Sequence, residues 1–159
     1  DLIKTFDPLY KVNPPLRTRK DIDALLKGLK DGTIDVIVSD HAPHAQEEKE
    51  VEFSFAPFGV IGMESMLPMI ITELVIKKVL TLSEAISKIT INPAKILGIP
   101  KGTLSVGADA DVTIFDIKKE WTIDPFLFKS KSRNCPFTGR KVYGKAFKVI
   151  VGGKIIDLI

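Results

Sequence analysis

The chain has a single cysteine among its 159 residues, Cys135, so no disulfide can form within it. A chain without disulfides fits a reducing compartment, and we expect the cytoplasm. Cys135 has no second cysteine near it, which favours a packed thiol over a nucleophile. Long apolar runs are also missing. The longest, over residues 66–76, contains Pro68 and Glu73 and is too short and too polar to span a bilayer.

Strong charge of one sign is lacking as well. The net charge is +3, which is too mild to indicate nucleic-acid binding by itself. Basic residues do gather between residues 129 and 154, but no DNA- or RNA-binding motif accompanies them. We therefore interpret this stretch as a solvated surface and expect neither a nucleic-acid nor a membrane partner.

Histidine is scarce too, because the chain has only two. Both, His41 and His44, lie in "SDHAPH", directly after Asp40 and after the apolar residues 36–38. Such a concentration of polar groups at the end of an apolar run indicates either a functional site or a polar turn that caps the next element.

Residues 18–30 carry apolar side chains at helical spacing, with Asp21 in the first turn and Gly32 after the end. The pattern predicts a helix with one apolar face, formed by Ile22, Leu25, Leu26 and Leu29.

Residues 34–39 contain the consecutive apolar residues 36–38 after Ile34, which predicts a strand buried on both faces. The loop 40–62 that follows is long, as functional loops often are. Within it, the acidic residues 46–52 are expected to be solvated.

Two helices are predicted after this loop. The first spans residues 63–79, where Pro68 requires either the first turn or a kink. The second spans residues 81–89 and opens with a capping box made by Thr81 and Glu84.

A third helix is predicted to begin with Asn92 as its cap and Pro93 at its first position, and to end before Gly98. Beyond it the pattern changes to short strands, and Gly152-Gly153 predicts a two-residue hairpin turn.

The order of elements predicts an α/β chain in two parts. Residues 1–99 read as strand-helix units of a parallel α/β architecture, and residues 100–159 as a small β-rich module. In a parallel α/β barrel, catalytic groups lie just past the carboxyl ends of the strands, which is where Asp40 falls. A carboxylate there can ligate a metal, act as a general base, or do both.

Several stretches resemble dihydroorotase of the amidohydrolase superfamily. These are "KVNPPLR", "SDHAPH", "FAPFGVIGMES" and the C-terminal "SKSRNCPFTGRKVYGKAFKVIVGGKI". "NPAKILGIPKGTLSVGADADVTIFD" resembles the junction of barrel and sandwich across the superfamily. The resemblance implies that residues 1–99 are the C-terminal part of a distorted TIM barrel and that residues 100–159 form a small β-sandwich module and tail.

The resemblance also implies an activity, the zinc-dependent, reversible cyclisation of N-carbamoyl-L-aspartate to L-dihydroorotate in pyrimidine biosynthesis. Asp40 would ligate one of one or two Zn²⁺ ions and carry the proton between the attacking water and the ring nitrogen. His44 would bind the substrate carboxylate, with Asn13 contacting the substrate and Phe58 and Gly59 doing so through their backbones.

Taken without the resemblance, some of these residues have plainer roles. Asn13 reads as a turn residue, Phe58 as core and Gly59 as a hinge. Arg17 is interpreted as a surface charge at a helix entry, and Glu64 as stabilising the first turn of its helix. His41 receives no role.

The remaining metal ligands of the family have no counterpart in the sequence, and a catalytic Zn²⁺ usually takes three protein ligands. We therefore expect this chain to be the C-terminal portion of a dihydroorotase. Its partners would be the N-terminal half of the same enzyme and the small-molecule substrate, with a second copy or aspartate transcarbamoylase as further candidates. Alone, the chain is expected to be inactive and to bind metal weakly.

Two alternatives stay open. A hydantoinase, dihydropyrimidinase or allantoinase would share the fold and Asp40, but its substrate lacks the carboxylate that His44 would bind. The second alternative is a non-catalytic dihydroorotase-like scaffold for aspartate transcarbamoylase. The presence of Asp40, His44 and Asn13 argues against loss of the site in this part of the enzyme.

Overall fold

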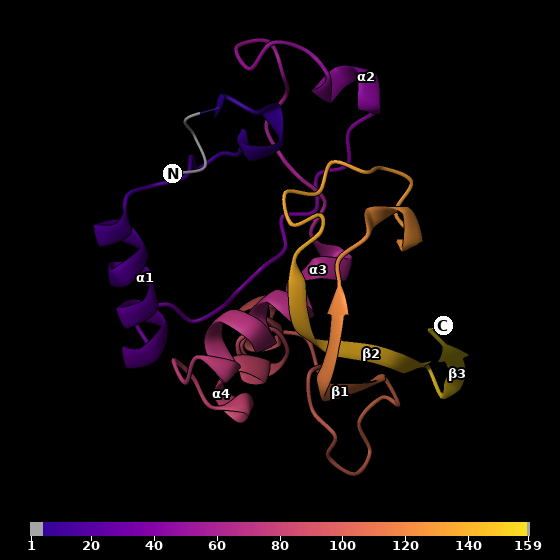
Figure 1. Ribbon diagram of the computed structural model, residues 1–159. Coiled ribbons are helices and arrows are strands. Elements are labelled where there is room, and N and C mark those ends of the chain that lie inside the picture. Colours follow the sequence, from indigo (N-terminus) through magenta and orange to yellow (C-terminus); the bar gives the residue numbers. More distant parts are fainter. Residues whose placement is uncertain (1–4, 159) are drawn as a thin grey trace. The chain divides into compact units, whose positions relative to one another are not determined.

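The computed structural model describes residues 5–158 (Figure 1). These residues form two compact units built from interleaved stretches of the chain. The first unit takes the residues up to Ala24 together with Ser39–Met66 and Thr122–Lys141. The second takes Leu25–Val38, Leu67–Trp121 and the residues from Val142 onward. No helix among the described residues has the length and apolar character needed to cross a membrane.

The first unit is mostly irregular chain around a small core. Its short helices are η2 (Pro8–Tyr10), α2 (Gln46–Lys49) and η4 (Pro125–Leu127). His41 and Val60 form an isolated parallel bridge, and the Ile61 N–H donates to the Asn134 carbonyl at 3.1 Å. The second of these bonds joins the stretch after Ser39 to the stretch after Thr122, and Ile61, Ile123 and Cys135 of these stretches are buried.

The strand predicted over residues 34–39 is absent from the described structure, so that prediction is wrong. The backbone from Ile34 to Val38 pairs with no strand; instead the Ile37 N–H donates to the Lys88 carbonyl at 3.0 Å. Val38 is 71% exposed rather than buried. The physical reason is that a strand needs a neighbouring strand to pair with, and here three backbone groups of the segment, the Ile34 and Asp35 carbonyls and the Ile37 N–H, bond to Lys88 and Asn92 instead.

Helix α1 (Arg19–Asp31) confirms the helix predicted over residues 18–30, and Gly32 follows with a positive φ of 84°. The helix predicted over residues 63–79 is divided. It consists of α3 (Met63–Ile70) and the π-helix η3 (Ile71–Ile76). Pro68 lies past the first turn of α3, and the wider turns of η3 begin three residues later.

Helix α4 (Leu82–Ser87) has the predicted capping box. The Thr81 hydroxyl accepts from the Glu84 N–H, and the Glu84 carboxylate accepts from the Thr81 N–H at 2.7 Å. Helix α5 (Ile91–Leu97) ends at Gly98 as predicted, but its N-cap is Thr90, so the assignment of Asn92 as the cap was wrong.

Asn92 lies inside α5 because its side chain has a different partner, donating to the Asp35 carbonyl at 2.9 Å. This amide therefore helps to satisfy the unpaired backbone of residues 34–38.

Strands β1 (Val112–Thr122), β2 (Lys141–Val151) and β3 (Lys154–Asp157) form one sheet with β2 in the middle (Figure 1). β2 and β3 are antiparallel with Val151 opposite Lys154, which confirms the hairpin turn at Gly152-Gly153. In the second unit β2 packs closely on η3: a Cβ at Gly144 would lie 2.8 Å from the Ile71 side chain.

Candidate functional site

Asp40 has an available carboxylate. Its φ is +41°, in the left-handed region, and its side chain is exposed. No other described residue hydrogen-bonds to it or pairs with its charge. The carboxylate is therefore available to a metal ion, a substrate or a proton.

His41 caps helix α3, a role that sequence reasoning left unassigned. Its Nδ1 accepts hydrogen bonds from the N–H groups of Gly62 at 3.1 Å and of Met63 at 3.3 Å. Because both partners are donors, Nδ1 carries no proton and the imidazole proton resides on Nε2. The ring satisfies N–H groups at the start of α3 that have no partner within the helix.

His44 is brought together with Phe58. The His44 Nε2 donates to the Phe58 carbonyl at 2.9 Å, since a carbonyl can only accept. On the other side of the ring, Nδ1 lies 3.6 Å from a Glu48 carboxylate oxygen, which is close enough for charge attraction but beyond a hydrogen bond. This nitrogen is therefore available as a second donor when the ring is protonated.

The backbone of His44 is held by Ser132. The Ser132 hydroxyl lies 3.3 Å from the His44 nitrogen and 2.6 Å from the His44 carbonyl oxygen, to which it donates. Ser132 also hydrogen-bonds to Asn134, and both side chains are buried. The position of the imidazole thus depends on a segment far away in the sequence.

Gly59 is required by close packing. Its φ is +116°, and a Cβ there would lie 2.5 Å from the Ala42 Cβ. The Gly59 N–H donates to the Lys11 carbonyl at 2.9 Å, and the Gly59 carbonyl accepts from the Asn134 amide at 3.2 Å. No other amino acid can bring this backbone so close to Ala42 without displacing it.

Asn13 is exposed, precedes Pro14 through a cis peptide bond, and makes no hydrogen bond within residues 5–158. Asn13 lies two residues after Lys11, whose carbonyl accepts a hydrogen bond from the Gly59 N–H. Arg17 lies 3.7 Å from Asp21 in the first turn of α1, as expected of a surface charge at a helix entry.

Sequence reasoning did not identify three residues of this site, Lys49, Ser132 and Asn134. Lys49 lies in the acidic stretch expected to be solvated, yet it is only 6% exposed, so that expectation was wrong at this position. The physical reason is that its ammonium hydrogen-bonds to backbone carbonyls inside the first unit. A lone lysine among four acidic side chains was the only available signal.

Glu64 lies in the first turn of α3 as expected, and one of its oxygens also accepts from the Ser130 N–H at 2.8 Å. The other oxygen is buried and has no hydrogen-bond partner among the described residues. Nearby Cys135 is fully buried, and this burial raises the pKa of its thiol. A packed, unreactive thiol was the expectation, and its environment agrees with it.

Within residues 5–158, no three His, Cys, Asp or Glu side chains gather closely enough to hold a metal ion. Asp40 fits a metal site as one oxygen donor, since carboxylates are common zinc ligands and its oxygens are unengaged. A complete zinc site would need further donors beyond this carboxylate.

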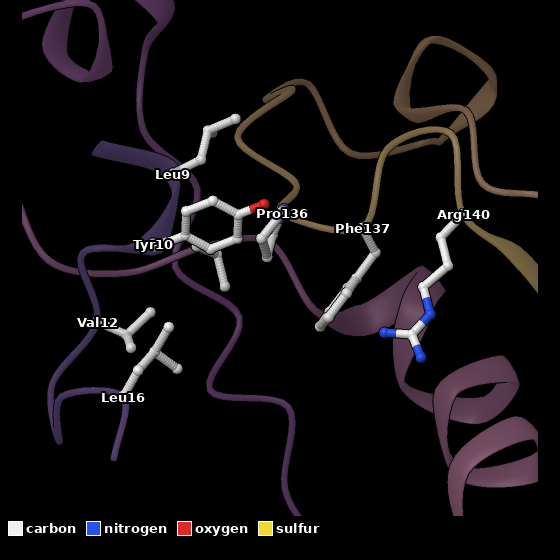
Figure 2. A pocket seen from close by; sticks show the side chains of 8 residues that line it. Leu9, Tyr10, Val12, Leu16, Pro136, Phe137 and Arg140 are labelled. Carbon is white, nitrogen blue, oxygen red and sulfur yellow. The ribbon is translucent and has the colours of Figure 1, made fainter. Parts of the chain in front are cut away.

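An apolar cavity of about 350 Å³ lies in the first unit near η2 (Figure 2). Its lining is apolar except for the Tyr10 hydroxyl and the Arg140 guanidinium. The lining residues are Leu9, Tyr10, Val12, Leu16, Val60, Pro136, Phe137 and Arg140.

Comparison with known proteins identifies relatives along nearly the whole chain. The amidohydrolase family profile matches residues 11–156. The dihydroorotase of Acetivibrio thermocellus is 51% identical over 153 residues, which are 96% of this chain and 36% of that protein. The dihydroorotase of Pelotomaculum thermopropionicum is 53% identical over 151 residues, which are 95% and 35%.

Among solved structures, an L-hydantoinase (dihydropyrimidinase) from Arthrobacter aurescens is similar with a TM-score of 0.89 and 34% identity, covering 98% of this chain and 37% of that one. A dihydropyrimidinase from Brevibacillus agri has a TM-score of 0.84 and 29% identity, covering 94% and 34%. The chain thus spans about a third of the length of these relatives. With its α/β content and the matched profile, the chain belongs to the amidohydrolase family.

Proposed function

We propose that the chain is the C-terminal portion of a zinc-dependent dihydroorotase, which interconverts N-carbamoyl-L-aspartate and L-dihydroorotate. The observation that carries this proposal is the identity of about half of all residues to dihydroorotases over nearly the whole chain. In this proposal residues 1–99 complete a distorted TIM barrel, and residues 100–159 form a β-sandwich module.

Asp40 is proposed as a ligand of a Zn²⁺ ion, in a site that holds one or two such ions. It is also proposed to carry the proton from the attacking water to the ring nitrogen. Its exposed carboxylate, free of partners among the described residues, supports both roles. A zinc ion would lower the pKa of a bound water to about 7 and so supply a nucleophile at neutral pH.

His44 is proposed to bind the substrate carboxylate through Nδ1. Its Nε2 already donates to the Phe58 carbonyl, and this bond fixes the plane of the ring. Protonated, the ring would offer the carboxylate a charge-assisted hydrogen bond, which is stronger than a neutral one.

Asn13, Phe58 and Gly59 are proposed to contact the substrate beside His44. The Phe58 N–H has no partner within the described residues and can donate to the substrate. Gly59 lets the backbone pass Ala42 at this point. Asn13 is linked to the same loop because the nearby Lys11 carbonyl accepts from the Gly59 N–H.

A hydantoinase or dihydropyrimidinase is the second candidate, favoured by the TM-score of 0.89 with the L-hydantoinase. The identity to that protein is 34%, against 51% to the Acetivibrio thermocellus dihydroorotase. His44 separates the two readings chemically, because a hydantoin or dihydrouracil ring carries no carboxylate for it to bind.

A chimera tests the proposal. In it, this chain replaces the matching segment of the Acetivibrio thermocellus dihydroorotase, so that all the residues discussed above come from this chain. We expect the chimera to hydrolyse dihydroorotate, and Asp40→Asn to abolish this activity. Hydrolysis of hydantoin or dihydrouracil in place of dihydroorotate would overturn the proposal, and a folded, zinc-loaded but inactive chimera would favour the scaffold alternative.

A further inference from the structure

Lys49 is a buried cation beside the candidate site. It ends the short helix α2, and its side chain is 6% exposed. Burying an ammonium group is unfavourable unless hydrogen bonds and charges compensate. The hydrogen-bond partners of this ammonium group therefore indicate the role of the buried lysine.

The Lys49 ammonium holds the loop that contains Phe58. It donates to the Pro57 carbonyl at 2.9 Å and to the Gly59 carbonyl at 3.2 Å. The carbonyl between them, that of Phe58, accepts from His44. Consecutive carbonyls of the loop thus point to the segment from His44 to Lys49, and the Phe58 N–H keeps one orientation.

A second lysine, Lys11, also contacts this loop. The Lys11 ammonium donates to the Ser54 carbonyl at 2.9 Å and lies 4.9 Å from the centre of the Phe58 ring. A cation over an aromatic ring is attracted by its electron-rich face. Desolvation, and after it the charge of Lys11, lower the pKa of Lys49, while Asp7 opposes this change.

We propose that Lys49 is a positioning residue for substrate binding: its ammonium holds the Pro57–Gly59 backbone so that Phe58 and His44 face the substrate together. Lys49 itself touches no reacting atom. The inference rests on the proposed function, in which the Phe58 backbone and His44 contact the substrate carboxylate and ring.

The kinetic test uses Lys49→Met in the chimera, with Lys20→Met as the matched control because Lys20 is exposed and has no partner among the described residues. We expect Lys49→Met to raise KM for dihydroorotate roughly tenfold or more with little change in kcat, since hydrogen bonds to a charged group are lost away from the reacting atoms. Lys20→Met should leave both constants unchanged.

A pH profile distinguishes positioning from general destabilisation. In the unsubstituted chimera, KM should rise on the alkaline side at a pH below that at which an ordinary lysine loses its proton. Lys49→Arg should move this rise to higher pH, because the guanidinium stays charged. An unchanged KM and pH profile in folded Lys49→Met would overturn the proposal.

Hydrogen exchange keeps this inference separate from the proposed function. In the chain itself, Lys49→Met should speed exchange of the Gly59 amide, which bonds to Lys11, while Lys20→Met should not. If the unsubstituted chimera fails to hydrolyse dihydroorotate, the proposed function fails, and the exchange experiment still decides whether Lys49 holds the loop. Equal Gly59 exchange in both variants would refute that.

Discussion

At the scale of residues, the two histidines of "SDHAPH" have different surroundings despite their closeness in sequence. His41 turns an unprotonated Nδ1 toward the N–H groups at the start of α3. His44 instead binds the Phe58 carbonyl and has a carboxylate near its other nitrogen. The first arrangement is structural, whereas in the second Nδ1 makes no hydrogen bond within the described residues and could donate to an anion only when the ring is protonated.

Substitution of His44 tests its proposed role. We expect His44→Gln in the chimera to lower kcat/KM for dihydroorotate by about tenfold to a hundredfold, because a charge-assisted hydrogen bond is lost. Glutamine can still donate to the Phe58 carbonyl, so the loop should persist. Steady-state kinetics would check this, and unimpaired dihydroorotate turnover would show that His44 does not bind the carboxylate.

Substitution of Gly59 tests the close approach of the loop to Ala42. Gly59→Ala is expected to lower the activity of the chimera and to destabilise its fold. Backbone strain alone would cost roughly 1–3 kcal/mol, and the loss should exceed this because the new Cβ also meets Ala42. Gly139→Ala is the control, since Gly139 has a φ of +77° but nothing within 4 Å of its Cβ. Urea unfolding would measure both, and equal losses would contradict the packing argument.

At the scale of elements, side chains rather than a strand ladder hold the segment that leads to the site. The carbonyls of Ile34 and Asp35 accept from Lys88 and Asn92, which belong to the α4–α5 region of the second unit. The start of α4 is in turn set by the reciprocal bonds of Thr81 and Glu84. The ordering of this segment therefore depends on how well these helices form.

The capping box of α4 predicts a pH dependence. Hydrogen bonds from Thr81 lower the pKa of Glu84, so the folded state binds its proton more weakly than the unfolded state does. This contribution to stability is present above the ordinary glutamate pKa and is lost as the pH falls through the lowered one. Urea unfolding between pH 6 and about 3 should show a shallower loss in Glu84→Gln than in the unsubstituted chain. Parallel curves would contradict this prediction.

At the scale of the whole molecule, each unit leaves large apolar side chains exposed. In the first unit Phe55 is 79% and Phe126 76% exposed, and in the second Leu97 is 70% exposed. The chain covers about a third of the length of its relatives, whose remaining residues have no counterpart in it.

We therefore predict that the isolated chain binds zinc weakly and does not hydrolyse dihydroorotate. The chimera, in contrast, is expected to retain zinc and to hydrolyse dihydroorotate. Asp40 is one donor, and a catalytic zinc usually takes three protein ligands. Zinc content after dialysis and a dihydroorotate assay, run side by side on the two proteins, would check this. Full activity of the chain alone would refute it.

Local features were predictable because their causes lie within a few residues. The helix of α1, the capping box at Thr81 and the turn at Gly152-Gly153 each follow from short-range spacing or turn chemistry. The strand at residues 34–39 was not predictable in the same way, because a strand exists only beside another strand. Asn92 was misassigned because its partner, the Asp35 carbonyl, lies far away in the sequence.

The candidate site shows the same division. "SDHAPH" by itself determined only that the backbones of Asp40, His41 and His44 would lie within one short segment, and their side chains do not form a cluster among the described residues. Only the tertiary structure decided that His41 caps a helix, that His44 meets Phe58, and that Lys49 is buried. Those outcomes depend on hydrogen-bond partners that lie between 8 and 22 residues away in the sequence. The bond between the His44 backbone and Ser132 spans 88 residues. No short sequence pattern encodes partners at such separations.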